Sequence, residues 1–316
     1  MTEATPRVSV VLPTYRRPAF VGRAVTSVQA QTTTSWELLI VDDNDRESPH
    51  RGETEALVTP MAAADGRIRY LRHERNLGGA AARNTGIGAA RAPFVAFLDD
   101  DDVWAPTKLE RQLDCFDRAA TDVALVYCRF RVVEIVTGRE RPHVTDGRSH
   151  AARDLLRRNT IGTTSCVMCR RAALLEVGSF DATLPARQDQ DLYLRLADRY
   201  RFAFVDETLV TMYVHGGPSI STSIDGSIRA NALFGDKYRT RVEADPPARF
   251  ALLYDLGKLL VAAERYTEAR TVLARALRLK PADVEAVTRL AMTYRLPRAF
   301  VGPTKRLLAL LRGLRG

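Results

Sequence analysis

The 316-residue sequence has little of what marks a membrane-spanning, secreted or disordered protein. No apolar run approaches the roughly 18 residues that a transmembrane helix needs, and residues 1–6 lack the basic and apolar regions of a secretory signal. Four cysteines are too few for a disulfide-stapled fold, and 46% hydrophobic residues are too many for a disordered chain. We expect one large core or two unequal domains, in the cytoplasm or at the inner face of the cell membrane.

The basic charge is concentrated at the end of the chain. Of the net charge of +9, +5 falls in the last twenty residues, where no acid occurs. The remaining charge is too small for a nucleic-acid footprint over the body of the protein, so we expect no nucleic-acid partner. The basic residues of this tail are Arg298, Lys305, Arg306, Arg312 and Arg315.

Two of the four cysteines, Cys166 and Cys169, have the C-x-x-C spacing of metal ligands. They lie in a predicted strand, where residues three apart face opposite sides. We therefore expect buried thiols in a reducing compartment rather than a metal site.

Short buried strands alternate with helical patterns over the first 130 residues. This βαβαβα order predicts the α/β class, with a mostly parallel sheet covered by helices on both sides. Ligands of such sheets bind beyond the carboxyl ends of the strands. The expected strands are 8–12, 37–41, 68–71 and 94–98, and the expected helices are 18–31, 79–90 and 106–119.

The pattern from 127 to 213 is mixed, with expected strands at 165–170, 202–205 and 209–214 and an expected helix at 189–199. No linker-like composition separates this part from the first. We therefore assign residues 1–245 to one domain.

Residues 246–296 match a 34-residue tetratricopeptide template, and a generic helical hairpin is the alternative. Helices are expected at 250–263, 267–279 and 283–294. One repeat and part of a second bury too little surface to stand alone, so this segment should pack on the preceding domain, a second copy or another protein. The template positions are Leu253, Leu256, Gly257, Leu260, Ala269, Leu273, Ala276 and Pro281.

The tail, residues 297–316, has leucines at amphipathic helical spacing beside its basic residues. Such a helix suits an anionic membrane surface. It suits equally a cap on the helical repeat or a contact with a partner subunit, and the sequence does not choose among the three.

The segment after the first strand, residues 13–18, lacks the Gly-x-Gly-x-x-Gly of a dinucleotide site. A classical dehydrogenase is therefore disfavoured. Gly86 and Gly88 form a Gly-x-Gly, but late in a predicted helix, where it has no phosphate to bind.

Acidic residues follow two of the predicted strands. Asp42 and Asp43 follow the second strand, and Asp99–Asp102 follow the fourth. One acid at such a place is often only a helix cap, as Asp102 would be. Four adjacent carboxylates repel one another and need a cation, and Mg²⁺ or Mn²⁺ with a diphosphate fits oxygen ligands.

A further acidic pair, Asp189 and Asp191, begins a predicted helix. The helix N-terminus stabilises both carboxylates, and in a concave site either one could accept a proton from a hydroxyl group. His215 precedes Gly216-Gly217, where a loop that closes over a ligand could add a metal or phosphate contact.

Taken together, five ordered motifs resemble family 2 glycosyltransferases of the GT-A fold over about residues 7–222. No feature of the resemblance identifies an individual protein. The motifs are residues 8–15, 41–43, 76–84, 97–104 and 188–195, supported by 166–171 and 177–181.

The resemblance implies roles on the donor side. Pro13, Tyr15 and Asp43 would line the nucleobase and ribose pocket, with Arg83 as a neighbour. In the Asp-x-Asp element, completed by Asp99, Asp100 would face the ribose. Asp101 would bind the metal ion, with His215 as a further metal contact.

On the acceptor side, the resemblance makes Asp189 the general base and Arg195 and Trp104 supports of the sugar pocket. Gln188 stands where the family has Glu, which puts the acidity of the base and the acceptor class in question. The implied reaction is an inverting, metal-dependent transfer from a nucleoside diphosphate sugar, UDP-linked by preference, to a glycan, lipid or peptide. The alternative is a protein-binding scaffold with a degenerate transferase domain.

Overall fold

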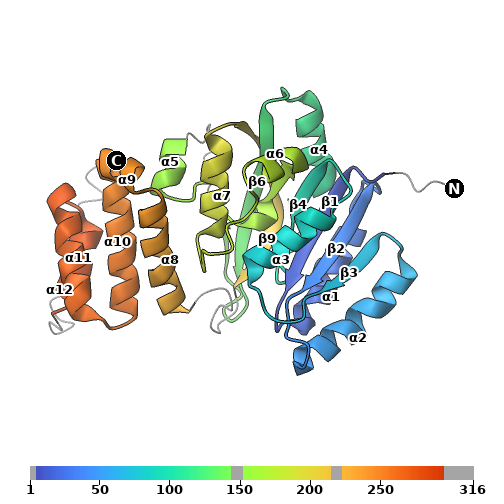
Figure 1. Ribbon diagram of the computed structural model, residues 1–316, viewed down its shortest axis with the longest axis horizontal. Coiled ribbons are helices and arrows are strands. Elements are labelled where there is room, and N and C mark those ends of the chain that lie inside the picture. Colours follow the sequence, from blue (N-terminus) through green and yellow to red (C-terminus); the bar gives the residue numbers. More distant parts are fainter. Residues whose placement is uncertain (1–4, 144–151, 215–222, 295–316) are drawn as a thin grey trace. The chain divides into compact units, whose positions relative to one another are not determined.

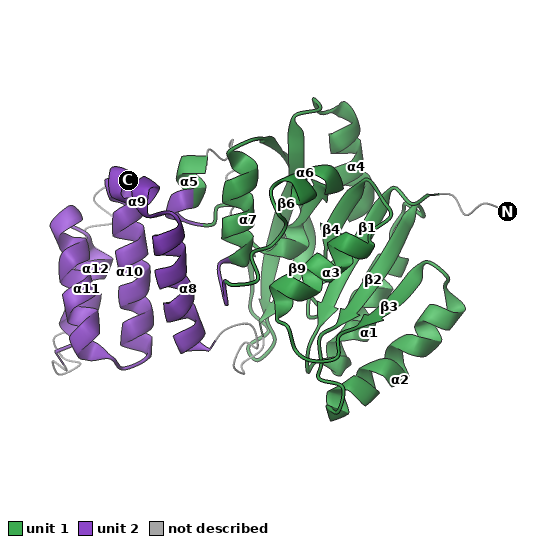
Figure 2. Ribbon diagram, viewed as in Figure 1, with its two compact units in different colours: residues 1–155, 159–183, 188–219 green, residues 156–158, 184–187, 220–316 purple. Residues whose placement is uncertain are grey.

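The computed structural model describes residues 5–143, 152–214 and 223–294. The chain forms two compact units (Figure 2), one containing residues 1–155, 159–183 and 188–219 and the other 156–158, 184–187 and 220–316. Each unit has its own architecture.

The first unit is built on a nine-stranded mixed sheet (Figure 1). Strands β3, β2, β1 and β4 lie side by side and parallel. Beyond β4 the order continues β8-β6-β9-β5, with β8 antiparallel to both neighbours and β7 paired to β6. The strands are β1 (Val8–Thr14), β2 (Trp36–Asp42), β3 (Ile68–Arg72), β4 (Phe94–Phe97), β5 (Val103–Trp104), β6 (Val123–Glu134), β7 (Glu140–His143), β8 (Val167–Arg170) and β9 (Arg201–Val214).

Helices cover both faces of the parallel part, because successive side chains of β1 point in opposite directions. Val10 belongs to the core that contains Val21 and Val25 of α1, whereas Val11 lies against Gly86 of α3. The helical elements before the second unit are α1 (Pro18–Gln29), α2 (Pro49–Ala64), α3 (Gly79–Ala89), α4 (Lys108–Arg118), α5 (Ala152–Arg157), the 3₁₀ turn Thr164–Cys166, α6 (Arg171–Glu176) and α7 (Gln188–Ala197).

The predicted α/β order is confirmed, with differences in the individual elements. The elements of the first unit without a counterpart among the expected ones are α2, β5, β6, β7, α5 and α6. The two strands expected at 202–205 and 209–214 form one strand, β9, because β6 pairs with its whole length. The ladder steps from Cys128–Val205 to Arg129–Thr208, so the polar residues between 205 and 208 are accommodated as an irregularity.

The second unit is helical, as predicted. Its elements are α8 (Ile224–Lys237), α9 (Arg239–Ala244), α10 (Pro246–Ala262), α11 (Tyr266–Leu279) and α12 (Val284–Met292). Helix α10 lies between α8 and α11 (Figure 1). A Cβ on Gly257 of α10 would lie 2.4 Å from Leu273 of α11, so the glycine permits the close approach of the two helices.

The structural boundary between the units differs from the predicted one at residue 245. Helices α8 and α9 belong with α10–α12. Asn231 of α8 donates a hydrogen bond to the Leu252 carbonyl of α10, and a Cβ on Gly235 of α8 would lie 2.8 Å from the Leu252 side chain. These contacts are tertiary, and no change of composition marks them in the sequence.

Within the described ranges, no helix is both long and apolar enough to cross a membrane. Cys128, Cys166 and Cys169 are buried and reduced, with Cys166 in the 3₁₀ turn and Cys169 on β8. The expectation of buried thiols is confirmed, although Cys166 lies just before the strand.

Candidate functional site

The carboxyl ends of β1, β2 and β4 place the predicted donor-side residues at one edge of the sheet. The parallel register aligns Thr14 with Asp42, and Leu98, which follows β4, donates a backbone hydrogen bond to Val11. Asp43 and Asp99 are the next residues along their segments. This proximity follows from parallel pairing, as the sequence predicted.

Asp43 is buried, and both of its carboxylate oxygens are engaged within the protein. Oδ1 accepts from the Leu77 backbone at 2.8 Å and lies 2.7 Å from His73 Nδ1. Oδ2 accepts from the Gly78 backbone at 2.9 Å and from the Asn76 amide at 2.8 Å. The structure therefore makes Asp43 the organiser of the segment that leads into α3, and its predicted contact with a nucleotide stays a prediction.

Asp100 and Asp101 share one cation in the structure, Arg17. The Arg17 guanidinium is ion-paired with Asp101 and lies 3.5 Å from Asp100 Oδ1, while Thr14 donates to Asp100 Oδ2 at 2.8 Å. Burial, reinforced by the neighbouring Asp101 carboxylate, raises the pKa of Asp100 to about 7. Arg17 was not among the predicted site residues. Its position after β1 was the only available signal, and charge pairing across 84 residues cannot be inferred from spacing.

Asp99 faces a different set of groups. Arg83 of α3 pairs with its Oδ1 at 2.5 Å, and the hydroxyls of Thr163 and Thr164 donate to it at 3.2–3.3 Å. Burial alone would lower the pKa of Arg83, but the Asp99 carboxylate outweighs it and raises the pKa. Arg83 thus stays charged beside the Asp-x-Asp element, and its predicted place next to a nucleobase and ribose pocket stays a prediction.

The two acids in the first turn of α7 have different surroundings. Asp191 is fully buried and ion-paired with Arg195 at 2.7 Å, and Arg195 also donates to the Ser179 carbonyl at 2.6 Å. Asp189 is partly exposed, and it accepts from the Asn159 amide at 2.7 Å. Burial raises the pKa of Asp189, whereas the Gln190 backbone N–H and Arg83 act in the opposite direction. Of the two acids, only Asp189 both interacts with Arg83 and retains an accessible surface.

Of the remaining predicted residues, some make contacts within the protein and others are partly exposed. Trp104 is buried, donates from Nε1 to the Ser165 carbonyl at 3.0 Å and stacks under Lys108 Nζ at 3.8 Å, so it supports the site from within the core. Arg195 likewise acts inside the protein. Pro13 and Tyr15 are partly exposed after the buried part of β1. His215 lies outside the described residues.

The carboxylates after β4 fit a divalent cation. Asp102 Oδ1 is buried without a hydrogen-bond partner among the described residues, and burial together with Asp99 raises the pKa of this carboxyl. In the described ranges, no three His, Cys, Asp or Glu side chains are grouped to hold a metal ion by themselves. Mg²⁺-type sites commonly use only one or two carboxylates and complete their shell with phosphates and water. The donor set of Asp100 and Asp101 matches that pattern, with Arg17 neutralising it in the structure.

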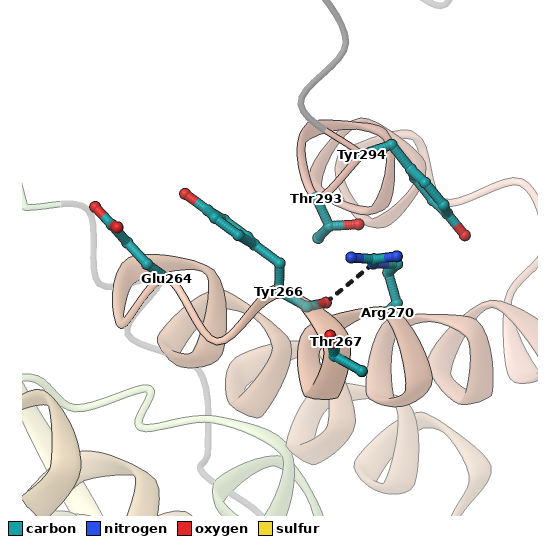
Figure 3. A pocket seen from close by; sticks show the side chains of 6 residues that line it. All are labelled: Glu264, Tyr266, Thr267, Arg270, Thr293 and Tyr294. Atoms are coloured by element: carbon teal, nitrogen blue, oxygen red, sulfur yellow. Dashed lines mark hydrogen bonds between the residues drawn. The ribbon is translucent and has the colours of Figure 1, made fainter.

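The second unit has a small pocket of about 330 Å³ that contains none of the predicted site residues (Figure 3). Arg270 extends across it below Tyr294, with its guanidinium 4.9 Å from the ring centroid, and donates from Nε to the Tyr266 carbonyl. The lining residues are Glu264, Tyr266, Thr267, Arg270, Thr293 and Tyr294.

Comparison with known families gives two matches. Residues 9–178 match Glycosyl transferase family 2, and residues 250–293 match a tetratricopeptide repeat. Among curated relatives, the putative colanic acid biosynthesis glycosyl transferase WcaA of Escherichia coli K12 is 30% identical over 222 residues, which are 69% of this chain and 76% of the relative. The matches span 17% to 78% of the lengths of the curated relatives, and several span less than half.

Solved structures show the same fold. TarS residues 1–349 of S. aureus, in complex with UDP-GlcNAc, match with a TM-score of 0.59 at 17% identity, covering 95% of this chain and 92% of that one. The mannosyltransferase PcManGT of Pyrobaculum calidifontis, in complex with GDP-Man and Mn²⁺, matches with a TM-score of 0.56 at 19% identity, covering 97% and 86%. The architecture is therefore of the GT-A type, followed by a helical segment. Since its family match covers more than half of the sequence, this chain belongs to glycosyl transferase family 2.

Proposed function

We propose that this protein transfers a sugar from a nucleoside diphosphate sugar, with a UDP-sugar as the preferred donor, to a hydroxyl group of a glycan, lipid or peptide. The transfer inverts the anomeric configuration and serves polysaccharide, glycolipid or other glycoconjugate synthesis. One observation carries the proposal: Asp99 of the donor-side element pairs with the Arg83 guanidinium at 2.5 Å, and Asp189 interacts electrostatically with the same group. This observation supports a single site that contains both the donor-side element and the proposed base.

On the acceptor side, Asp189 is the proposed general base. Its carboxylate takes the proton of the acceptor hydroxyl as that oxygen attacks the anomeric carbon and the bond to the nucleoside diphosphate breaks. A raised pKa suits this role, because a stronger base accepts the proton more readily. Asp191 is unsuited to it, since its carboxylate is fully buried and paired with Arg195.

On the donor side, Asp101, with Asp100 beside it, would hold Mn²⁺ or Mg²⁺, and His215 is proposed as a further contact. Such an ion, when bound, stabilises the negative charge of a leaving diphosphate. Pro13, Tyr15 and Asp43 are the proposed nucleotide-side residues, with Arg83 adjacent. The complexes of similar structures with UDP-GlcNAc, and with GDP-Man and Mn²⁺, support a nucleotide-sugar donor and a divalent ion.

The proposal is tested by donor binding. UDP-glucose, UDP-GlcNAc and GDP-mannose are added with and without Mn²⁺, and the melting temperature is recorded. A donor at about 100 times its Kd stabilises the protein by about 2.7 kcal/mol, or about 4 °C for a chain of this length. We expect this shift to require Mn²⁺ and to be lost in Asp101→Ala.

Asp236→Ala, which changes an exposed acid of α8, serves as the control and should keep the shift. If none of the three donors stabilises the wild-type protein in Mn²⁺, or if Asp101→Ala keeps the full shift, the assigned donor site is wrong.

The scaffold function is retained as the second candidate, because Gln188 departs from the family pattern and residues 250–293 match a protein-binding repeat. A degenerate transferase domain would release no nucleotide from any sugar nucleotide. Mn²⁺-dependent hydrolysis of a donor, with water as the acceptor, would exclude this alternative.

A further inference from the structure

Neighbouring hydrogen-bonding groups fix the orientation of the Asn159 side-chain amide, which contacts Asp189. Asn159 Oδ1 accepts hydrogen bonds from the backbone N–H groups of Ile161 and Gly162, both at 3.0 Å. Since an N–H group needs an acceptor, the amide oxygen must lie on that side. The Nδ2 group therefore faces the Gly162 carbonyl at 2.9 Å and Asp189 Oδ2 at 2.7 Å. All four hydrogen-bonding positions of the amide are used.

The loop that carries Asn159 is held in one conformation. Gly162 has φ +108°, a value that favours glycine, and a Cβ there would lie 2.5 Å from the Phe130 ring. Three residues further on, the Ser165 carbonyl accepts from Trp104 Nε1, and Ser165 Oγ accepts from the Asp99 backbone. Asn159 thus projects from a fixed support rather than from an unanchored turn.

The same loop contacts the donor-side element. Thr163 and Thr164 donate to Asp99, and Asp99 pairs with Arg83, which in turn interacts with Asp189. Residues 159–165, called here the bridging loop, therefore contact both carboxylate groups of the proposed site. The predicted motifs did not include this loop before Cys166.

We propose that Asn159 is a positioning residue: from the bridging loop, its amide orients the Asp189 carboxylate and favours its ionised form for proton transfer from the acceptor. This proposal rests on the proposed function, in which Asp189 is the base. A hydrogen bond donated to a carboxylate stabilises the charged form, so removing it makes the carboxyl harder to ionise. The other titratable groups that interact with Asp189 are Arg83, Asp99 and Tyr193.

The decisive substitution is Asn159→Asp. It keeps the acceptor oxygen for Ile161 and Gly162, but it replaces the donor to Asp189 with a second carboxylate. Like charges at this distance raise the pKa of one partner, and we expect the titration of Asp189 to move upward by about one pH unit or more. The ¹³Cγ resonance of Asp189 reports this directly. It is assigned by its loss in Asp189→Asn, in protein labelled at aspartate.

Enzyme kinetics give the second readout. Nucleotide release from the donor identified by thermal shift, with Mn²⁺ and water as the acceptor, is followed against pH. In Asn159→Asp the acid limb of kcat should move upward with the NMR titration, while KM for the donor stays unchanged. Asn159→Ala should lower kcat and move the limb in the same direction, by less.

Asn231→Asp is the matched control, because it also removes an amide donor to a backbone carbonyl, in the second unit. It should lower the melting temperature and leave the Asp189 titration unchanged. An unshifted Asp189 resonance in Asn159→Asp would overturn the positioning role even if the wild-type enzyme is active. If the resonance shifts but the wild-type protein turns over no donor, the contact is established and the proposed function is rejected.

Discussion

At the scale of single residues, Asp189 and Asp191 show how two acids on one helix turn acquire different uses. Asp191 is fully buried and its charge is neutralised by Arg195, which also fastens the Ser179 backbone. Asp189 lies beside Arg83 and Asn159 with part of its surface accessible. Asp191 therefore serves the fold, and Asp189 is the acid that we propose as the base.

Matched Asn substitutions separate these two roles. Asp189→Asn should keep its melting temperature and lose about 10²–10⁴-fold in kcat, which is the usual contribution of a general base. Asp191→Asn should lower the free energy of unfolding by about 1–3 kcal/mol, because Arg195 loses its charged partner. Urea unfolding and nucleotide release, measured on both variants, check this. An active Asp189→Asn would remove Asp189 from the mechanism.

Lys108 is a buried cation that no predicted role uses. Its side chain is fully buried, donates to Gln112 Oε1 at 2.7 Å and lies 3.8 Å from the centroid of the Trp104 ring. Burial lowers the pKa of Lys108 to about 8, from a model-compound value of 10.5. Between these two values the unfolded chain binds more protons than the folded one, so stability contributed by this group rises with pH.

We expect the wild type to gain stability over Lys108→Met between pH 8 and pH 10, by at most about 3 kcal/mol. Below pH 8 the difference should be constant, because both states hold the proton. Urea unfolding at pH 7.5 and 9.5 measures the change. Lys258→Met, at an exposed lysine, should show none. A flat difference for Lys108→Met as well would mean that the amine is not shielded from water.

At the scale of elements, the approach of α3 to β1 depends on one of the two glycines of the Gly-x-Gly sequence. A Cβ on Gly86 would lie 2.3 Å from Val11 Cγ1, whereas a Cβ on Gly88 would meet nothing within 4 Å. The Gly-x-Gly of the sequence is therefore a packing feature of a helix on a strand, not a phosphate loop. Because Arg83 lies on α3, this packing also sets the distance between Arg83 and the edge of the sheet.

Alanine substitutions at the two glycines should have opposite effects. Gly86→Ala should cost about 1–3 kcal/mol through overpacking, and Gly88→Ala should be neutral or stabilise by up to about 1 kcal/mol through helix propensity. Thermal or urea unfolding compares them. Adding Val11→Ala to Gly86→Ala should recover part of the loss. Equal effects at both glycines would contradict the packing argument.

At the scale of the whole molecule, the last described helix, which exposes several apolar side chains, is followed by the basic tail. Helix α12 exposes Val284, Val287 and Met292, and Tyr294 follows it. The basic tail comes next in sequence and lies outside the described residues. The leucines of the tail suit burial against any one of three surfaces: a membrane, the exposed face of α12 or a partner subunit.

If the tail binds an anionic membrane, the full chain should co-sediment with vesicles containing anionic lipid, and a protein ending at Arg298 should not. Each basic residue near such a surface contributes about 1 kcal/mol. The difference should vanish in neutral vesicles and at high salt. Equal sedimentation of both proteins would end the membrane hypothesis, and sedimentation velocity would then distinguish a cap on the repeat from an interface between copies.

The sequence was sufficient for features that depend on nearby residues. Buried runs located β1, β2, β3 and β4, and the acids after them could be assigned to one sheet edge because parallel strands end together. The 34-residue spacing located α10, α11 and α12. Strand β9 was predicted in two pieces because its polar middle imitates a turn, and only pairing with β6 makes it continuous.

Only the tertiary structure decided which polar side chains, distant in sequence, pair with one another. Arg17 pairs with Asp101 across 84 residues, and Asn159 with Asp189 across 30. Neither pairing has a periodicity or a motif, because it depends on where distant backbone segments are brought by the packing of the core. The sequence by itself identified the candidate site residues and the sheet edge at which those after β1, β2 and β4 gather. The folded chain determined which of them are neutralised inside the protein and which remain able to react, because burial and partner distance are properties of the assembled core.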